Sequence, residues 1–281
     1  VIDKNGKLVG LVPVRDLILA RGNRRISEIM ERDFLSVGVT MDQEEVANFA
    51  RKYDLVSVPV VDENNKLLGR ITIDDIVDVM EEEATEDIHK MAGLVDEEEV
   101  REKAILRIVR ARIPWLVWGL MGGLISAAVM INFESNLKEK IVLAYFVPVI
   151  MAMAGNIGIQ SSALVVRGLA TGEIAAQDYL SRCGKEMGIS LLNGIILSSL
   201  LFAVVAIGWH NQDEHSLQLA LLISLALVMV ILIAGILGST IPLVLKKFNI
   251  DPALATGPFI TTSNDIIGLF IYLSIATQML K

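Results

Sequence analysis

The chain has 281 residues, of which 53% are hydrophobic, and a mean hydropathy of +0.55, so it is too apolar for an ordinary soluble domain. Its formal charge is −8, and most of its Asp and Glu residues precede the first long apolar run, which argues against nucleic acid as a partner. A single cysteine, Cys183, excludes an intrachain disulfide and a CxxC metal or redox motif. The sequence therefore predicts an acidic soluble part followed by a membrane part.

The soluble part contains an internal repeat. Val1–Gly10 matches Val60–Gly69, and each copy has the pattern of a strand, an Asn/Gly turn, a second strand and a helix. The second copy also carries an upstream part, with a helix over residues 42–53 that leads into an apolar strand. The first copy lacks that part, so we expect the chain to begin inside the first copy.

This pattern resembles a tandem pair of CBS domains, through the Val-Pro-Val-Val-Asp of residues 58–62 and the run from Gly69 to Asp75. The resemblance implies an α/β fold, with residues 1–25 as the C-terminal half of the first CBS domain and residues 26–80 as the second. CBS pairs are regulatory modules, so the resemblance indicates a sensor. No P-loop, nucleophile with a base, or His-rich zinc pattern appears in the soluble part, which argues against an enzyme.

A connector helix is predicted over residues 81–112. Strong helix formers dominate this stretch, which is first acidic and then basic, and no proline occurs before Pro114. The acidic run can be a solvated helix face. Alternatively, because closely spaced carboxylates repel one another unless a cation screens them, Mg²⁺ or Ca²⁺ can control how this region packs.

The rest of the chain, residues 113–281, is predicted to be an all-α transmembrane domain of five helices, since each apolar run reaches the roughly 20 residues that span the hydrocarbon core. The predicted spans cover residues 113–133, 141–166, 187–209, 216–245 and 252–280. Lys and Arg are concentrated before the first span, between the second and third, and between the fourth and fifth. The positive-inside rule therefore predicts a cytosolic N-terminus and a C-terminus on the outside.

The fifth span carries one acidic residue, Asp265. An ionisable group at membrane depth costs at least about 2.5 kcal/mol unless it faces protein or water, so it is a candidate functional residue. At 100 degrees per residue, Asp265 shares a polar helix face with Pro258, Thr261 and Thr262. The alternative is a structural role for Asp265, as a cap of a broken helix or a partner of a buried Arg, but no Lys or Arg lies at comparable depth.

The second span is interrupted by Pro148 and by a polar patch over residues 155–162, which includes Asn156 and Gln160. Such residues either hydrogen-bond to neighbouring helices or line water, and the sequence leaves both roles open. Together with Asp265, this patch favours a function in moving cations.

These features resemble the MgtE family of magnesium channels, also called MgtE-type magnesium transporters. The segments that carry the resemblance are Glu83–Lys90, Arg112–Leu116, Phe133–Ser135, Val147–Ser161, Arg167–Thr171 and Asp251–Leu273. The resemblance covers essentially the whole chain, without the family's N-terminal helical domain and the first half of its first CBS domain.

The resemblance implies a homodimer in the plasma membrane, whose second and fifth helices line a pore on the two-fold axis and take up Mg²⁺. The implied pore residues are Asp265, Thr261, Asn156, Gln160 and Pro258. A secondary transporter coupled to Na⁺ or H⁺ is the alternative. The ranking among Mg²⁺, Mn²⁺, Co²⁺ and Ca²⁺ stays open, because one ring of Asp has little intrinsic preference among them.

The resemblance also implies a second, regulatory role for Mg²⁺. The implied ligands are Asp42, Glu44, Asp54, Asp75, Asp78, Glu83, Glu86 and Asp87. Bound Mg²⁺ would screen these carboxylates and close the pore, and loss of the ion would open it. Family members can bind adenine nucleotide in the CBS cleft, but the incomplete first copy puts that site in doubt here.

Overall fold

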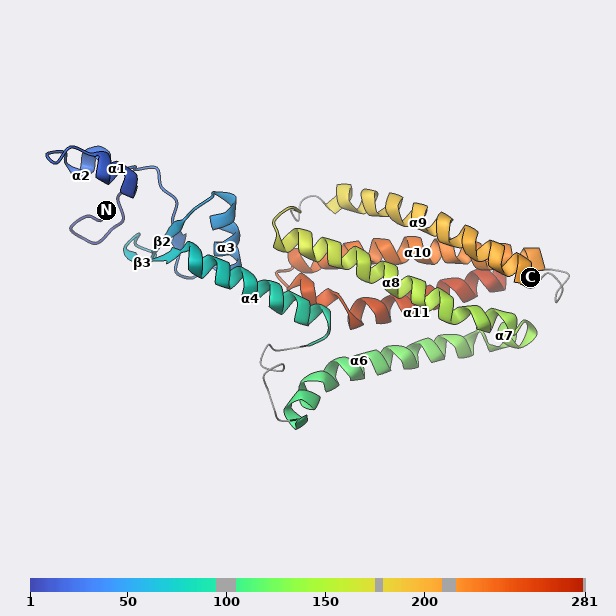
Figure 1. Cartoon of the computed structure of the whole chain (residues 1–281). Helices are drawn as coiled ribbons and strands as arrows, with labels where there is room; N and C mark the ends of the chain where they lie inside the picture. The colour runs from blue at the N-terminus through green and yellow to red at the C-terminus, as the bar shows by residue number, and fades with distance from the viewer. Residues whose placement is uncertain (95–104, 175–178, 209–215, 280–281) are drawn as a thin grey trace. The chain divides into compact units, whose positions relative to one another are not determined.

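The structure is a computed structural model that describes residues 1–94, 105–174, 179–208 and 216–279 (Figure 1). The chain forms two compact units, Val1–Thr85 and Glu86–Lys281. The first is a small α/β unit and the second is built from helices, as the sequence predicts. The predicted connector over residues 81–112 lies partly outside the described residues, and so do the ends of the third and fifth predicted spans.

The first unit is centred on a three-stranded sheet of order β1–β2–β3. Strand β2 (Ser57–Val61) pairs in parallel with β1 (Val37–Gly38) and antiparallel with β3 (Leu67–Thr72). Helix α3 (Gln43–Lys52) and the start of α4 (Ile73–Met91) bury their apolar residues in one cluster with the sheet. The buried members of this cluster are Val37, Val46, Ala47, Ala50, Val58 and Ile76. Two short helices, α1 (Val14–Leu19) and α2 (Ile26–Ile29), precede the sheet.

The sequence repeat corresponds to two equivalent turns. Asp3 accepts hydrogen bonds from the backbone N–H groups of Asn5 and Lys7 (2.8 and 2.9 Å), and Asp62 accepts the same pair from Asn64 and Lys66 (2.9 and 2.8 Å). The hydrogen bond from the Lys7 backbone is the main cause that lowers the pKa of Asp3. The two copies therefore share one turn geometry.

The two turns also bind each other reciprocally. The N–H of Leu8 donates to the carbonyl of Asn65 and the N–H of Leu67 donates to the carbonyl of Gly6, each at 3.0 Å. Gly6 and Asn65 both have a positive φ (82° and 59°), which Gly and Asn tolerate best. The two copies of the repeat thus contact each other through an approximately two-fold symmetric pair of hydrogen bonds within the first unit.

The second unit contains five helices with the length and composition of membrane spans. They are α6 (Ile105–Asn132), α8 (Val142–Ala170), α9 (Tyr179–Gly208), α10 (Ser216–Lys247) and α11 (Pro258–Met279). The short helix α7 (Glu134–Glu139) joins α6 to α8, and the 3-10 helix η2 (Pro252–Ala255) precedes α11. Helical structure satisfies backbone hydrogen bonds internally, which a hydrocarbon environment requires.

Helix α10 packs against α8, α9 and α11 and supplies much of the core of this unit (Figure 1). Ile150 of α8, Ile223 of α10 and Leu269 of α11 are fully buried in this core. Helix α6 packs against α11, where Trp118 stacks on Phe259 with ring centroids 5.9 Å apart. Most other side chains of α6 and α9 face outward, as expected for helices that meet lipid or another subunit.

Glycines set how closely α8 and α10 approach. A Cβ placed on Gly238 of α10 would lie 2.5 Å from the carbonyl oxygen and 3.0 Å from the Cα of Gly158 in α8. Both obstacles are backbone atoms, so the helices would have to move apart to admit a side chain. Small residues of this kind are what allow membrane helices to pack by close van der Waals contact.

We therefore expect Gly238→Ala to destabilise the protein by about 1–3 kcal/mol, the usual range for overpacking a tight core. Thermal unfolding in detergent, followed by tryptophan fluorescence, measures this change. Gly188→Ala is the matched control, because a Cβ on this glycine of α9 meets nothing within 4 Å. An equal loss of stability in both variants would contradict the close contact.

Candidate functional site

Asp265 lies on α11, a helix that begins after a break in the helical structure of the chain. Asp251 caps η2 by accepting a hydrogen bond from the N–H of Ala253 (2.8 Å). Gly257 follows with φ +58°, and Pro258 takes the first position of α11, where proline is favoured. This break sets the rotation of α11 and hence the direction in which Asp265 projects.

Asp265 and Thr261 face α8 together, because they are one turn apart. A Cβ placed on Gly155 of α8 would lie 3.7 Å from Thr261 Cγ2 and 3.8 Å from Asp265 Oδ1. Asp265 is partly buried, and among the described residues its carboxylate has no hydrogen bond or ion pair. The absence of a side chain at Gly155 leaves room beside an unpaired carboxylate within a membrane span.

The hydroxyl of Thr261 donates within its own helix, with the carbonyls of Gly257 and Pro258 both 3.1 Å away. Its remaining lone pairs can still accept from a water or contact an ion. Pro258 itself lies two turns before Asp265 and faces Gly93. The residues of the predicted polar face therefore have different neighbours. Thr261 and Asp265 lie together beside Gly155, whereas Pro258 lies at the start of the helix.

Asn156 and Gln160 project from α8 and are exposed in the single chain. They are one turn apart on the same face, and Asn156 follows Gly155 directly. Asn264 behaves differently, because it is only 2% exposed and its Nδ2 donates to the carbonyl of Ala154 (3.3 Å). The exposed amides of α8 thus follow the glycine that faces Asp265, while Asn264 joins α8 to α11.

The predicted regulatory acids of the first unit mostly serve local structure. Asp42 caps α3 through the N–H of Glu44 (2.9 Å), and Glu83 accepts from Gln43 Nε2 (2.7 Å), which joins α3 to α4. Asp54 has a positive φ of 50° in the turn after α3. Asp78 is exposed on α4.

Asp75 accepts hydrogen bonds from the hydroxyl and the N–H of Thr72 (2.6 and 2.9 Å). These bonds, the hydroxyl first, lower the pKa of Asp75 and favour its charged form. Within the described part of the chain, no group of three or more His, Cys, Asp or Glu side chains is close enough together to hold a metal ion. The regulatory Mg²⁺ sites implied by the resemblance therefore stay predictions.

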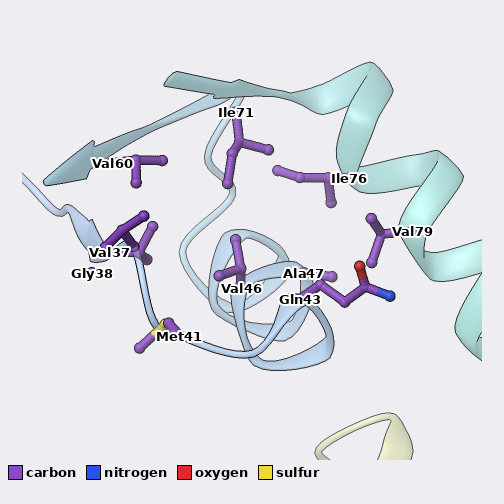
Figure 2. A pocket seen from close by; sticks show the side chains of 11 residues that line it. Val37, Gly38, Met41, Gln43, Val46, Ala47, Val60, Ile71, Ile76 and Val79 are labelled. Atoms are coloured by element: carbon purple, nitrogen blue, oxygen red, sulfur yellow. The ribbon is translucent and has the colours of Figure 1, made fainter. Parts of the chain in front are cut away.

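The first unit has a small pocket of about 130 Å³ between the sheet, α3 and α4 (Figure 2). Val60 and Ile71 of the sheet, Val46 of α3 and Val79 of α4 point into it. None of its lining residues is charged, so the pocket offers no side chain to pair with a phosphate. Nucleotide binding in this pocket has no support from its lining.

Lys90 forms an ion pair that the sequence did not indicate. This residue near the end of α4 pairs with Glu86 one turn earlier and with Asp251 (2.5 Å), 161 positions further along the chain. Burial opposes the charged form of Lys90, but the hydrogen bonds to Asp251 and Glu86 outweigh it and raise its pKa. Asp87, another predicted regulatory acid, also lies in the last turns of α4.

Glu186 is a second intramembrane carboxylate that sequence reasoning missed. The predicted third span began at residue 187, whereas α9 begins at Tyr179 and its membrane-spanning part at Ser181. The basic residues Arg182 and Lys185, which both come just before Glu186, made this stretch look like a cytosolic loop. The signal that could have found it is the helical spacing of Glu186 with Ser190.

Comparison with known proteins gives two family matches. Residues 147–275 match the model described as MgtE, a divalent cation transporter, and residues 26–82 match the CBS domain. The chain is 40% identical to the magnesium transporter MgtE of Thermus thermophilus over 283 residues, which is 100% of this chain and 61% of that protein. It is 38% identical to magnesium transporter MgtE of Bacillus subtilis, with the same two coverages.

The chain thus spans about 61% of the length of these relatives. Among solved structures, the crystal structure of the soluble part of a magnesium transporter matches 30% of this chain and 32% of that one. The matched residues are 43% identical, and the TM-score is 0.29.

We expect Lys90→Gln to lower the free energy of unfolding by about 1–2 kcal/mol, between the values for exposed and buried ion pairs. Lys90 and Asp251 are 23% and 32% exposed, so solvent screens the pair only in part. Because the folded state raises the pKa of Lys90, the stabilisation is complete below the ordinary lysine value of 10.5 and is lost as pH rises through the raised value.

Chemical denaturation at pH 7 and pH 9 measures this effect, and the difference between parent and variant should be equal at the two values. Lys138→Gln is the matched control, since its pair with Glu134 is 75% and 59% exposed and should contribute less than about 0.5 kcal/mol. If Lys90→Gln were as stable as this control, the pair with Asp251 would have no role in holding the fold.

Proposed function

This chain belongs to the MgtE family of divalent cation transporters, and on that premise we propose that it is a Mg²⁺-selective channel that mediates magnesium uptake across the plasma membrane. The observation that carries this proposal is the carboxylate of Asp265. It lies unpaired among the described residues of a membrane-spanning helix, beside Gly155 and one turn from Thr261. An ionisable group so placed is a functional residue by default.

The two exposed amides of α8 support a pore between two copies of the chain. Asn156 and Gln160 lie within a membrane span and are exposed in the single chain. Contact with hydrocarbon would leave their amide groups without hydrogen-bond partners, which costs several kcal/mol for each group. A homodimer with a pore on its two-fold axis gives these amides water or a partner subunit instead.

Two copies of Asp265 across that axis carry the charge of one Mg²⁺. Because Mg²⁺ gives up its water reluctantly, a pore lined by carboxylate, amide and hydroxyl groups suits the hydrated ion, which these groups contact through its waters. The oxygen ligands also fit a hard cation better than a soft one. In this arrangement Asp265 supplies the charge, while Thr261, Asn156 and Gln160 contact the hydration shell.

We further propose that cytosolic Mg²⁺ gates the channel through the acidic residues of the soluble unit and of the end of α4. Asp75 and Asp78 are both exposed on α4, and like charges so close along a helix repel one another until a cation screens them. The positions of Lys and Arg favour an orientation with this unit in the cytosol and the C-terminus outside.

Asp265→Asn tests the pore. We expect passive Mg²⁺ flux into liposomes, at a set voltage and with no other gradient, to fall at least about tenfold. Removal of a charge in contact with the hydrated cation changes the interaction by about 1.4 kcal/mol or more, which is the free energy of a tenfold change. An entrapped Mg²⁺-sensitive dye measures the flux.

Ser263→Ala is the matched control, because it removes a polar group from the same helix, two positions from Asp265 and on a different face. Flux that is equal in Asp265→Asn and parent would move the pore elsewhere. Flux that appears only when Na⁺ or H⁺ is supplied would favour the secondary transporter.

Asp75→Asn and Asp87→Asn test the gate. Each removes one charge, and asparagine at position 75 can still accept from Thr72, so the local fold is retained. We expect inhibition by internal Mg²⁺, measured in patch recordings, to require at least about threefold more Mg²⁺ in each variant. Asp74→Asn is the control, as an exposed neighbour outside the predicted set. Unchanged inhibition in both test variants would count against the proposed gate.

A further inference from the structure

Glu186 occupies a polar site between α8, α9 and α10. It is 3% exposed, the hydroxyl of Ser161 in α8 donates to its Oε1, and its Oε2 has no partner. Ser190 lies one turn further along α9, is 1% exposed and also has an unpartnered hydroxyl. Its Oγ lies against Gly235 of α10, a contact that a side chain there would prevent. Two acceptor atoms on one face of α9 are therefore buried without partners.

A buried carboxylate needs a compensating positive charge, because burial of an isolated ion costs many kcal/mol. Arg182 lies one turn before Glu186 on the same helix, but its Nε is itself buried without a partner. The other charged groups on the three helices are Lys185 on α9, Arg167 on α8, and Lys246 and Lys247 at the end of α10. None of these basic residues forms an ion pair with Glu186 in the described part of the chain.

We infer that Glu186 binds a small monovalent cation of the Na⁺ type, in a site completed by the hydroxyl oxygens of Ser161 and Ser190. One carboxylate balances one monovalent cation, whereas Mg²⁺ would leave a buried excess charge. Mg²⁺ would also bring waters that it releases reluctantly, into a space closed by the contact of Ser190 with Gly235. The donor set of one carboxylate and neutral hydroxyls therefore selects a small monovalent ion.

This site is distinct from the one at Asp265. Gly155, which faces Asp265, and Ser161, which binds Glu186, are both buried on α8 but are six residues apart. Six residues correspond to about 9 Å along the helix and to different sides of it. The inference goes beyond the proposed channel function and does not require that the chain conduct Mg²⁺.

The test is the thermal unfolding temperature of the purified full chain in detergent, compared with Glu186→Gln. One series raises NaCl at constant ionic strength with choline chloride at pH 7. The other varies pH in choline chloride without Na⁺. If Na⁺ is the ligand, the Tm of the parent rises about 3 °C for each tenfold increase above Kd, and Glu186→Gln does not respond. A Tm of the parent that changes with pH relative to Glu186→Gln but does not respond to Na⁺ would overturn the inference.

Two further variants keep the test decisive if Glu186→Gln unfolds. Ser190→Ala removes one oxygen of the site and should weaken the apparent affinity about tenfold. Ser224→Ala removes another buried, unpartnered hydroxyl from α10, away from the site. This variant should keep the parental response. Parent and Ser190→Ala curves that coincide in the NaCl series would also overturn the inference.

Discussion

The contact of α8 with two neighbours at Gly158 is the constraint on which the helical unit depends. On one side, a Cβ at Gly158 would collide with the amide of Asn264 in α11. On the other side, a Cβ on Gly238 of α10 would lie only 2.5 Å from the carbonyl oxygen of Gly158. Apolar helices gain no hydrophobic free energy by leaving lipid, so such close van der Waals contacts have to hold them together. One residue thus fixes α8 against both α10 and α11.

The position of both intramembrane carboxylates follows from this contact. Asn264 donates to the carbonyl of Ala154 and so fixes the register of α11 on α8, which brings the next residue, Asp265, to Gly155. On another side of α8, Ser161 holds Glu186 of α9. A shift of α8 against α10 would therefore change the surroundings of both acids. In a bilayer, where each unpaired polar group is costly, that coupling makes the packing of small residues a determinant of ion chemistry.

The sequence alone was sufficient to predict the repeated turns of the first unit and the membrane spans of the second. The turns at Asp3 and Asp62 follow from a local pattern, and five apolar runs of membrane length leave few other folds. Asp265 stood out because nothing near it is charged. Glu186 did not stand out, because Arg182 and Lys185 just before it are typical of the residues that flank a span. Only the packing of the helices shows that Glu186 is buried. The pair of Lys90 with Asp251 joins residues 161 positions apart, which no local pattern can indicate.

The contacts at the start of α11 join this helix to the end of α4. Lys90 binds Asp251, the residue that caps η2, and Gly257 lies against the carbonyl of Met91 so closely that a side chain would not fit. Gly257 has a positive φ (58°) in the turn into α11, so this turn needs a glycine both for its backbone conformation and for the close contact with Met91. Asp265 lies two turns further along a continuous helix, which transmits rotation rather than absorbing it. The residues that break the chain before α11 are therefore also the ones in contact with the end of α4, which is where the proposed gate would act on α11.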